Sequence, residues 1–273
     1  LIEGLPSGSE FPEGTTTVTY RYTDLGGNYV DCSFDVTVVD DEPPIFTPSS
    51  LLDRDVDLDE NCQFIIPDYT GLTTATDNCN PDPDVSQSPA QGSILSGHNS
   101  TQTITLIADD GGGNVNTTDF TITALDSDPP GLTCKDTTIA LEQNGEASIN
   151  AIDLILSLND NCKDSSDISL ILSKNSFDCD DIGVNSLILT AYDNNGNSAQ
   201  CSPQVTIIDT IPPVVNCSNI NNGQLDINTG LLNINPSQID DNSTDNCGIS
   251  DMRLSKSQFT CEDIGDNTVW LIV

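Results

Sequence analysis

Residues 187–213 read LILTAYDNNGNSAQCSPQVTIIDTIPP, and this stretch decides the fold. Apolar residues take every second position in two short runs on either side of an Asn- and Gly-rich segment. Such alternation is typical of two strands that each bury one face, and Gly and Asn tolerate the positive φ that tight turns need. The stretch therefore predicts a β-hairpin followed by a proline-stiffened exit.

The same block occurs three times along the chain. Its Pro-Pro pairs begin at residues 43, 129 and 212, which are 86 and 83 residues apart, and its Gly-Asn turns keep the same two offsets. Self-similarity at a fixed spacing indicates a repeat array. We expect the C-terminal part of one repeat over residues 1–41, complete repeats over 42–128 and 129–211, and the N-terminal part of a fourth over 212–273, a window cut from a longer protein.

The length of each block sets the fold class. Six or seven short strands fit into about 85 residues, which predicts an all-β fold of tandem immunoglobulin-like antiparallel β-sandwiches arranged as an elongated array. One competing stretch, residues 151–158, has the spacing of a short helical turn. The residues expected to face inward on the hairpins of the two complete repeats are Ile104, Leu106, Ala108, Phe120, Ile122, Ala124, Leu187, Leu189, Ala191, Val205 and Ile207.

The charge of the chain restricts its partners. It carries 43 acidic and 7 basic residues, a formal net charge of -36. This balance argues against nucleic acid or an anionic membrane surface as a partner and favours cation binding and a self-repelling, soluble chain. No apolar run approaches the 18 or more residues of a membrane span, so we expect no membrane insertion of this segment.

Two cysteine positions recur at repeat spacing and are absent together from the middle repeat. Cys32 and Cys201 follow the Gly-Asn turn, while Cys134 and Cys217 follow the Pro-Pro pair; the middle repeat carries Thr118 and Pro48 in these places. A joint absence is what a disulfide predicts, because a lone thiol in a secreted module is a liability. We therefore expect a Cys134–Cys201 disulfide, and partners outside residues 1–273 for Cys32 and Cys217.

The remaining cysteines fall into three pairs, each inside one repeat and each with one member in an Asp-Asn-Cys triplet. These predicted disulfides are Cys62–Cys79, Cys162–Cys179 and Cys247–Cys261. Zinc binding by four thiolates would need close Cys-x-x-Cys pairs, which the sequence lacks. The ten cysteines thus favour disulfides and an oxidising, extracellular location.

Several motifs point to one family of modules. They are Phe11-Pro12-x-Gly14-Thr15-Thr16-Thr17-Val18-Thr19-Tyr20, Gly27-Asn28, Cys32-Ser33-Phe34, and the Asp-Asn-Cys triplets from Asp77, Asp160 and Asp245. These motifs resemble the hyalin repeat family, an extracellular module with an immunoglobulin-like fold. More narrowly, Pro67-Asp68-Tyr69-Thr70 and Phe177-Asp178-Cys179 look like the versions found in giant secreted surface proteins of Bacteroidota, including gliding-motility adhesins. The resemblance implies a structural role at the cell surface, since such modules serve as spacers in many surface proteins.

Acidic residues recur at the expected junctions between repeats. In an immunoglobulin-like topology the end of one repeat meets the loops of the next, which would gather two sets of candidate Ca²⁺ ligands. The sets are Asp40, Asp41, Glu42, Asp77 and Asp110, and Asp126, Asp128, Asp160 and Asp193. Hard oxygen ligands on short loops suit Ca²⁺, and residues 38–44 resemble a cadherin linker, which implies a calcium-stiffened joint. Turn capping and solubility explain the same acids, so both interpretations stay open.

Two further patterns concern modification and catalysis. Thr137 and Thr210 sit in Asp-Thr-Thr and Asp-Thr-Ile, which look like an O-glycosylation motif of Bacteroidota. His98 is the single histidine and has no counterpart at repeat spacing, so we interpret it as a solvated loop residue. Paired carboxylates recur in every repeat, whereas an active site is normally singular. The sequence therefore predicts no enzyme and no cofactor other than Ca²⁺.

The predicted function is mechanical. We expect a repeat segment of a long secreted surface adhesin or filament, acting as a disulfide-stapled stalk for attachment or gliding at the cell surface. Its partners would be neighbouring repeats of the same chain, an extracellular glycan or surface, and cell-surface secretion or motility machinery. The alternatives are modules that bind glycans directly, or a spacer within a secreted hydrolase.

Overall fold

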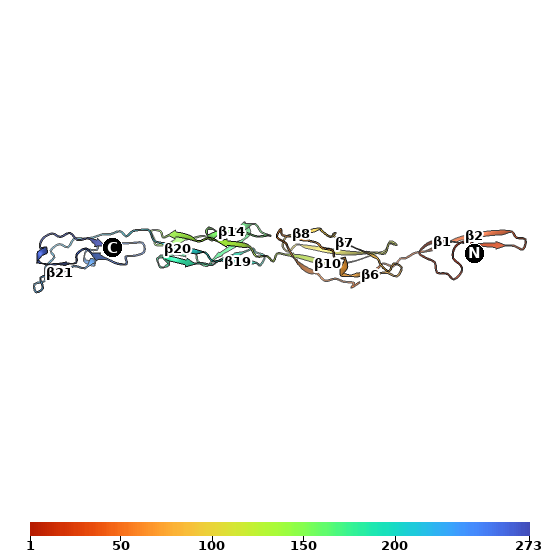
Figure 1. Cartoon of the computed structure of the whole chain (residues 1–273), viewed down its shortest axis with the longest axis horizontal. Coiled ribbons are helices and arrows are strands. Elements are labelled where there is room, and N and C mark those ends of the chain that lie inside the picture. The colour runs from red at the N-terminus through yellow and green to blue at the C-terminus, as the bar shows by residue number, and fades with distance from the viewer. The chain divides into compact units, whose positions relative to one another are not determined.

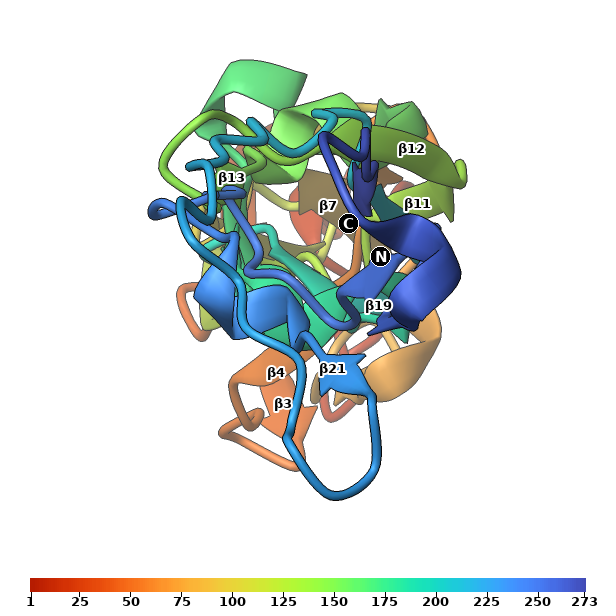
Figure 2. The same ribbon diagram turned by 90° about the vertical axis from the view of Figure 1, so that its left-hand side faces the viewer.

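The computed structural model describes residues 1–273 as two compact units, Leu1–Ser127 and Asp128–Val273. Strands dominate both units (Figure 1 and Figure 2), and the helical pieces are short 3-10 turns, named η1 to η6 in chain order. No helix is long and apolar enough to cross a membrane. The division falls within a residue of the seam expected after residue 128, while the seams expected after 41 and 211 lie inside the two units and stay predictions.

The first unit begins with the predicted hairpin. Strand β1 (Gly14–Thr23) pairs antiparallel with β2 (Tyr29–Val38), with Val18 opposite Phe34. The Asp24 carboxylate accepts the backbone N–H of Asn28 at 2.8 Å and so closes the turn. Val18 is buried, whereas Phe34 on the opposite strand is about half exposed.

The remainder of the first unit is a two-sheet sandwich. One sheet has the order β4-β10-β9-β7, and the other face carries the pairs β3·β6 and β5·β8. Strand β4 runs parallel to β10, whereas all other pairs are antiparallel, an arrangement typical of immunoglobulin-like sandwiches. The elements are β3 (Ile45–Thr47), β4 (Arg54–Asp57), β5 (Gln63–Ile65), η1 (Thr70–Leu72), β6 (Thr74–Thr76), β7 (Asp84–Ser88), β8 (Ile94–Ser96), β9 (Thr101–Asp109) and β10 (Val115–Leu125).

The core of this sandwich follows the predicted alternation. The inward positions expected on β9 and β10 are all buried, which confirms the alternation predicted from the sequence. Tyr69 meets Phe120 edge to face, with ring centroids 5.2 Å apart. The buried apolar residues are Phe46, Leu58, Ile66, Tyr69, Leu95, Ile104, Leu106, Ala108, Phe120, Ile122 and Ala124.

The second unit repeats this plan with shorter pieces. The elements of the complete repeat are β11 (Gly131–Cys134), β12 (Thr137–Ala140), β13 (Ala147–Ser148), η2 (Ala151–Leu154), β14 (Ile155–Asn159), η3 (Ser165–Asp167), β15 (Ser169–Leu172), β16 (Ser176–Phe177), η4 (Cys179–Asp181), β17 (Gly183–Ser186), β18 (Leu189–Tyr192), β19 (Ser198–Cys201) and β20 (Gln204–Ile208). The helical turn that competed with a strand over residues 151–158 is real: η2 occupies its first half and β14 its second.

The large sheet of this repeat is split in two, as β12-β20-β17 and β15-β18-β19. Pro203 interrupts the last strand between β19 and β20, because proline has no N–H for the ladder. Its carbonyl still accepts the N–H of Leu187 at 3.0 Å, which holds the neighbouring strand across the break. The core is Leu141, Ile149, Leu154, Phe177, Leu187, Leu189, Val205 and Ile207.

Residues 212–273 form a smaller body with short strand pairs, β21·β23 and β22·β24. Its core is Ile234, Ile239 and Phe259. Its elements have counterparts in the preceding repeat, and the expected division after residue 211 stays a prediction. The elements are β21 (Leu232–Asn233), η5 (Pro236–Gln238), β22 (Arg253–Leu254), β23 (Gln258–Phe259), η6 (Cys261–Asp263) and β24 (Leu271–Ile272).

Candidate functional site: the repeat junctions

Three aspartates converge where the linker of residues 39–44 meets the middle repeat. Asp40, Asp77 and Asp110 each place a carboxylate oxygen within 4.8 Å of the other two. Ligand oxygens around one Ca²⁺ ion lie 2.3–2.6 Å from it, so they can be at most about 5 Å apart. The three carboxylates therefore meet the distance requirement for a shared Ca²⁺ ion, and they supply three of the six to eight ligands that it takes.

Asp110 also shapes its own turn. Its Oδ1 accepts the backbone N–H groups of Gly112, Gly113 and Asn114 at 2.7, 3.0 and 3.0 Å, and its Oδ2 accepts the Asn114 side-chain amide at 2.6 Å. Desolvation raises the pKa of Asp110, but these hydrogen bonds outweigh it and lower the pKa below the ordinary value. The buried carboxylate is ionised and holds the β9–β10 turn even without a cation.

The other two aspartates likewise cap local loops. Asp77 Oδ1 accepts the N–H groups of Cys79 and Asn80 at 2.8 and 2.9 Å, and Asp40 Oδ1 accepts that of Glu42 at 3.3 Å. Turn capping thus accounts for one carboxylate oxygen of Asp40 and one of Asp77. It does not require these carboxylates to lie close to each other and to that of Asp110. Both interpretations of the acidic pattern are compatible with this geometry.

Asparagines connect the linker to the loops of the middle repeat, a role that the sequence analysis did not predict. Asn78, the central residue of the first Asp-Asn-Cys triplet, donates to Glu42 Oε2 at 2.5 Å. Asn114 Nδ2 donates to the Asp40 carbonyl at 3.1 Å, and Asn116 Nδ2 to the Pro44 carbonyl at 2.7 Å. The recurrence of Asn in the triplet was the available signal for this role. Glu42 therefore serves as a hydrogen-bond acceptor here, and Asp41 lies outside the acidic cluster.

Acids of the second predicted set also accept hydrogen bonds from nearby loops. Asp193 is fully buried, and its Oδ1 accepts backbone N–H groups of its own turn, including that of Gly196 at 3.1 Å. Desolvation raises the pKa of Asp193, but these hydrogen bonds lower it overall. Asp160 Oδ1 accepts the N–H of Cys162 at 2.9 Å, and Asp128 accepts the Asn161 amide at 3.4 Å.

Asp126, the fourth member of that set, is buried in the first unit, and its backbone N–H donates to His98 Nδ1 at 2.9 Å. His98 therefore acts in a backbone contact rather than as an open loop residue. Calcium binding by Asp126, Asp128, Asp160 and Asp193 stays a prediction.

The structure contains the predicted disulfide between Cys134 and Cys201. It joins the end of β11 to the end of β19; the two cysteines are 67 positions apart in sequence, and their Cα atoms are 5.9 Å apart. In the chain-entropy model, closing a loop of this length contributes about 4 kcal/mol to the stability of the repeat. This disulfide is a staple within one repeat.

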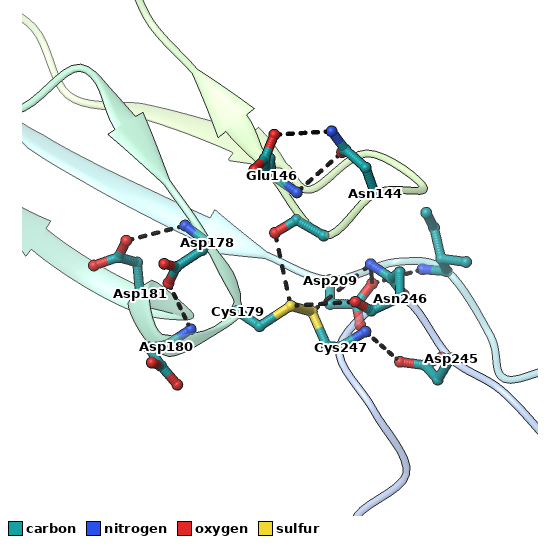
Figure 3. The surroundings of a disulfide bond; sticks show 12 residues. Asn144, Glu146, Asp178, Cys179, Asp180, Asp181, Asp209, Asp245, Asn246 and Cys247 are labelled. Carbon is teal, nitrogen blue, oxygen red and sulfur yellow. Dashed lines mark hydrogen bonds between the residues drawn. A yellow bond between two sulfur atoms is a disulfide. The ribbon is translucent and has the colours of Figure 1, made fainter.

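The second described disulfide, Cys179–Cys247, links residues 129–211 to residues 212–273 (Figure 3). Cys179 begins η4, whereas Cys247 ends an Asp-Asn-Cys triplet that follows the Pro212-Pro213 linker. The Cα atoms are 5.4 Å apart and the cysteines are 68 residues apart in sequence. Consecutive repeats are therefore joined covalently at this junction as well as through the backbone.

Three predicted disulfides are wrong. Cys179 pairs with Cys247 and not with Cys162, so Cys162–Cys179 and Cys247–Cys261 are both excluded. Cys62 is in a disulfide while Cys79 is a free thiol, which excludes Cys62–Cys79. The physical reason, within the second unit, is that Cys162 lies in the loop whose Asn161 binds Asp128 where the chain enters the repeat, whereas Cys179 contacts Cys247 where the chain leaves it.

Hydrogen bonds surround the Cys179–Cys247 disulfide (Figure 3). Asn246 Nδ2 donates to Asp209 Oδ1 at 3.2 Å and to the Glu142 carbonyl at 3.4 Å. Cys179 Sγ lies 3.5 Å from the Asn246 carbonyl oxygen. The central Asn of the triplet thus contacts a linker carboxylate, as Asn78 does at the first junction.

The other predicted positions are exposed or part-buried. Cys32, Cys79, Cys217 and Cys261 are exposed free thiols. Partial desolvation, and then the negative charges of Asp40, Asp77 and Glu13, raise the pKa of Cys79. Thr210 is exposed on the linker, and Thr137 is half-buried at the start of β12. Partners of Cys32 and Cys217 outside residues 1–273, and O-glycosylation of the two threonines, stay predictions.

Comparisons with known proteins support a hyalin-repeat module. Residues 1–38 match the HYR domain family. The chain is 33% identical over 223 residues to hyalin of Strongylocentrotus purpuratus, a match that covers 78% of this chain and 18% of that protein. It is 29% identical over 221 residues to hyalin of Lytechinus variegatus, covering 78% and 40%. The chain thus spans less than half the length of each of these two relatives.

Among solved structures, the chain is similar to the protocadherin GammaB4 extracellular domain, at 16% identity and a TM-score of 0.33, with coverage of 89% of this chain and 45% of that one. It is also similar to the protocadherin gammaB7 EC3-6 structure, at 17% identity and a TM-score of 0.34, with coverage of 76% and 62%. At these scores the likeness says nothing of function.

Proposed function

We propose that this chain is a structural segment of an extracellular, adhesion-type repeat protein, and that its task is to span distance under load without catalysing a reaction. The observation that carries the proposal is the Cys179–Cys247 disulfide, which continues the covalent path from one repeat into the next. Disulfides of this kind persist in oxidising environments, which fits an extracellular location. The hyalin-like sequence supports the same class of protein.

The two described disulfides overlap, and the overlap determines how the segment resists extension. Cys179 precedes Cys201, so the shortest covalent path from Cys134 to Cys247 passes through both disulfides and only residues 179–201. Pulling cannot extend the rest of residues 134–247 until a disulfide is reduced. At about 3.4 Å per extended residue, the length withheld is roughly 300 Å.

Single-molecule stretching of the full chain, with and without a thiol reductant, tests the proposal. We expect the oxidised chain to release at least roughly 300 Å less contour length than the reduced chain. A variant with Cys32→Ser and Cys217→Ser is the matched control, because both cysteines are exposed free thiols, and its extension should equal that of the unaltered chain. Full extension of the oxidised chain would contradict the stapled-stalk proposal.

Direct glycan binding is the weaker alternative. Three exposed aromatic residues of the first hairpin, Tyr22, Tyr29 and Phe34, would be its natural site. At the 86-residue offset Tyr22 and Phe34 correspond to Ala108 and Phe120, which are buried core positions of the middle repeat, whereas Tyr29 corresponds to the exposed Val115. Two of the three positions therefore match core positions, which favours a packing role for them over a shared ligand platform.

A calcium-stiffened first junction is part of the proposal. The support is the convergence of Asp40, Asp77 and Asp110. Adding Ca²⁺ to the full chain should raise its Tm, as measured by thermal unfolding at increasing Ca²⁺ concentrations. Asp40→Asn should abolish the rise and Asp41→Asn, in the same linker but outside the cluster, should keep it. An equal response of both variants would assign the acids to turn capping and solubility alone.

The finer proposal is a gliding-motility adhesin on the surface of a Bacteroidota cell, with secretion or motility machinery as a partner. It is supported by the resemblance of Pro67-Asp68-Tyr69-Thr70 and Phe177-Asp178-Cys179 to segments of such proteins. Surface labelling of intact source cells tests it: labelled protein that moves along gliding cells supports it, and protein confined to an immobile matrix overturns it.

A further inference from the structure

Cys261 and Cys179 occupy equivalent positions, 82 residues apart. Each is the first residue of a 3-10 turn, η6 and η4, and each turn has the same reciprocal capping. At η4 the Asp178 side chain accepts the N–H of Asp180 at 3.0 Å; at η6 the Thr260 hydroxyl accepts that of Glu262 at 3.2 Å. The backbone that presents the sulfur is thus the same in both places.

The side chains around the two sulfurs also correspond. Lys174 forms an ion pair with Asp181, and Lys256 forms one with Asp263. The lysine ammonium groups lie 5.2 Å from the Phe177 ring centroid and 5.1 Å from that of Phe259, respectively. A common frame of lysine, aspartate and buried phenylalanine therefore fixes each turn against the core of its repeat.

A left-handed glycine completes both surroundings. Gly145 has φ +75°, and a Cβ added there would lie 3.1 Å from Cys179 Sγ and 2.7 Å from the Asn246 carbonyl oxygen. Gly230 has φ +69°, and its Cβ would lie 3.8 Å from Cys261 Sγ. At Gly145 the missing side chain makes room for the Asp-Asn-Cys loop, and Gly230 occupies the corresponding position beside Cys261.

The difference between the two places is their occupancy. The face at Cys179 holds the triplet Asp245-Asn246-Cys247, whereas Cys261 is an exposed free thiol. We infer that the face formed by Gly230 and η6 is a docking site for the Asp-Asn-Cys loop of another hyalin-repeat module, which it captures as a disulfide through Cys261. The inference rests on the proposed stalk function and adds that neighbouring repeats attach to one another through the same contact.

The covalent step needs an oxidant, and a low-molecular-weight disulfide such as oxidised glutathione supplies it. Its S–S bond breaks as the two cysteine thiols lose two protons and two electrons, and one protein disulfide and two glutathione thiols form. The geometry selects the partner, because the Asn of the incoming triplet donates to a backbone carbonyl of the docking face, as Asn246 does to Glu142.

The test uses the full chain in a glutathione redox buffer with a synthetic peptide of residues 243–251, STDNCGISD. Non-reducing peptide mapping measures how much peptide each of the four free thiols carries, so Cys32, Cys79 and Cys217 serve as controls within the same molecule. We expect Cys261 to carry about tenfold more peptide than any of them. Replacing the peptide Asn by Ala should remove the preference. Equal labelling of all four thiols, indifference to that Asn, or a homodimer through Cys261 alone would overturn the inference.

Gly230→Asn separates docking from thiol reactivity. Asn tolerates positive φ, so the turn should survive while its side chain blocks the face beside Cys261. Capture of the peptide should fall about tenfold, while labelling of Cys261 by iodoacetamide stays unchanged. Gly248→Asn, at a left-handed glycine next to Cys247, is the matched control and should retain capture. Retained capture by Gly230→Asn would overturn the inference. Because the stretching experiment depends on Cys134, Cys179, Cys201 and Cys247, failure of docking at Cys261 would leave the proposed function standing.

Discussion

The middle repeat and the repeat that follows it share one strand plan but are held together differently. In the later repeat a disulfide joins Cys134 to Cys201. At the equivalent place in the middle repeat, the Thr118 hydroxyl donates to the Ser49 carbonyl at 3.3 Å. A neutral hydrogen bond contributes about 1 kcal/mol, against about 4 kcal/mol for the staple. The fold is therefore determined by the core residues that alternate along the strands. The disulfide adds stability to the later repeat and is not needed for the middle repeat to fold.

The middle repeat has an aromatic cluster instead. The Arg54 guanidinium lies over the rings of both Tyr69 and Phe120, at 5.6 and 4.7 Å from their centroids, and the rings meet edge to face. The later repeat has Pro203 at the position of Phe120, which also breaks its last strand. Aromatic pairs and cation–π contacts add about 0.5–2 kcal/mol each, so they offset part of the missing staple.

Removing the staple should have the largest effect. The double variant Cys134→Ser with Cys201→Ser should lower the unfolding free energy of residues 129–211 by about 4 kcal/mol, because it restores the entropy of a 67-residue loop to the unfolded chain. Native-state hydrogen exchange with mass spectrometry resolves the two repeats within one molecule. Protection of residues 42–128 should be unchanged, and a loss below about 1 kcal/mol would contradict the role assigned to the staple.

Removing the aromatic cluster should have an intermediate effect on the other repeat. Phe120→Leu should destabilise residues 42–128 by about 1–2 kcal/mol, since it removes the edge-to-face pair with Tyr69 and the ring beneath Arg54. Phe64→Leu, at a part-buried phenylalanine, is the matched control and should lower the unfolding free energy by less than Phe120→Leu does. Equal losses in the two variants, measured by hydrogen exchange, would show that only ring volume matters.

Thr118→Val tests the hydrogen bond that stands in place of the disulfide. It keeps the shape of the side chain but leaves the Ser49 carbonyl without its donor, so residues 42–128 should lose about 1 kcal/mol. Thr123→Val, on the same strand β10, is the control for the change from hydroxyl to methyl. If both variants behave alike, the contact with Ser49 does not stabilise the repeat.

Acid should affect the two repeats alike, because both hold a buried turn aspartate. The folded pKa values of Asp110 and Asp193 are lowered, so their stabilisation is complete above the ordinary pKa of 3.8 and is lost as pH falls through the lower folded values. Unfolding midpoints should therefore decline below about pH 4. Asp110→Asn should weaken the decline in the middle repeat only, and Asp193→Asn in the later repeat only. A decline that neither variant alters would assign acid sensitivity to other carboxylates.

Sequence periodicity predicted the parts of the fold that depend on local pattern. Ile104, Leu106 and Ala108 are buried as their alternation requires, and the joint absence at Pro48 and Thr118 identified the Cys134–Cys201 staple. Alternation cannot reveal strand order across two sheets, so it missed the parallel pairing of β4 with β10. The split of the large sheet follows from Pro203, since a proline inside a strand pattern predicts an interruption of the strand.

The candidate junction was predicted in part. The grouping of Asp40, Asp77 and Asp110 followed from the expected topology, because exit and entrance loops of adjacent repeats meet. The Cys179–Cys247 pairing did not, because spacing in sequence favours partners in the same repeat, whereas the two cysteines of one repeat lie at opposite ends of its sandwich. Which cysteines pair depends on the end of the sandwich at which each cysteine-bearing loop lies.

Non-reducing proteolysis of the native chain, followed by mass spectrometry of the linked peptides, measures that pairing directly. A cross-linked peptide that contains Cys179 and Cys247 is the expected product, together with one that contains Cys134 and Cys201. Peptides that join Cys162 to Cys179, or Cys247 to Cys261, would contradict a chain of repeats covalently locked to one another.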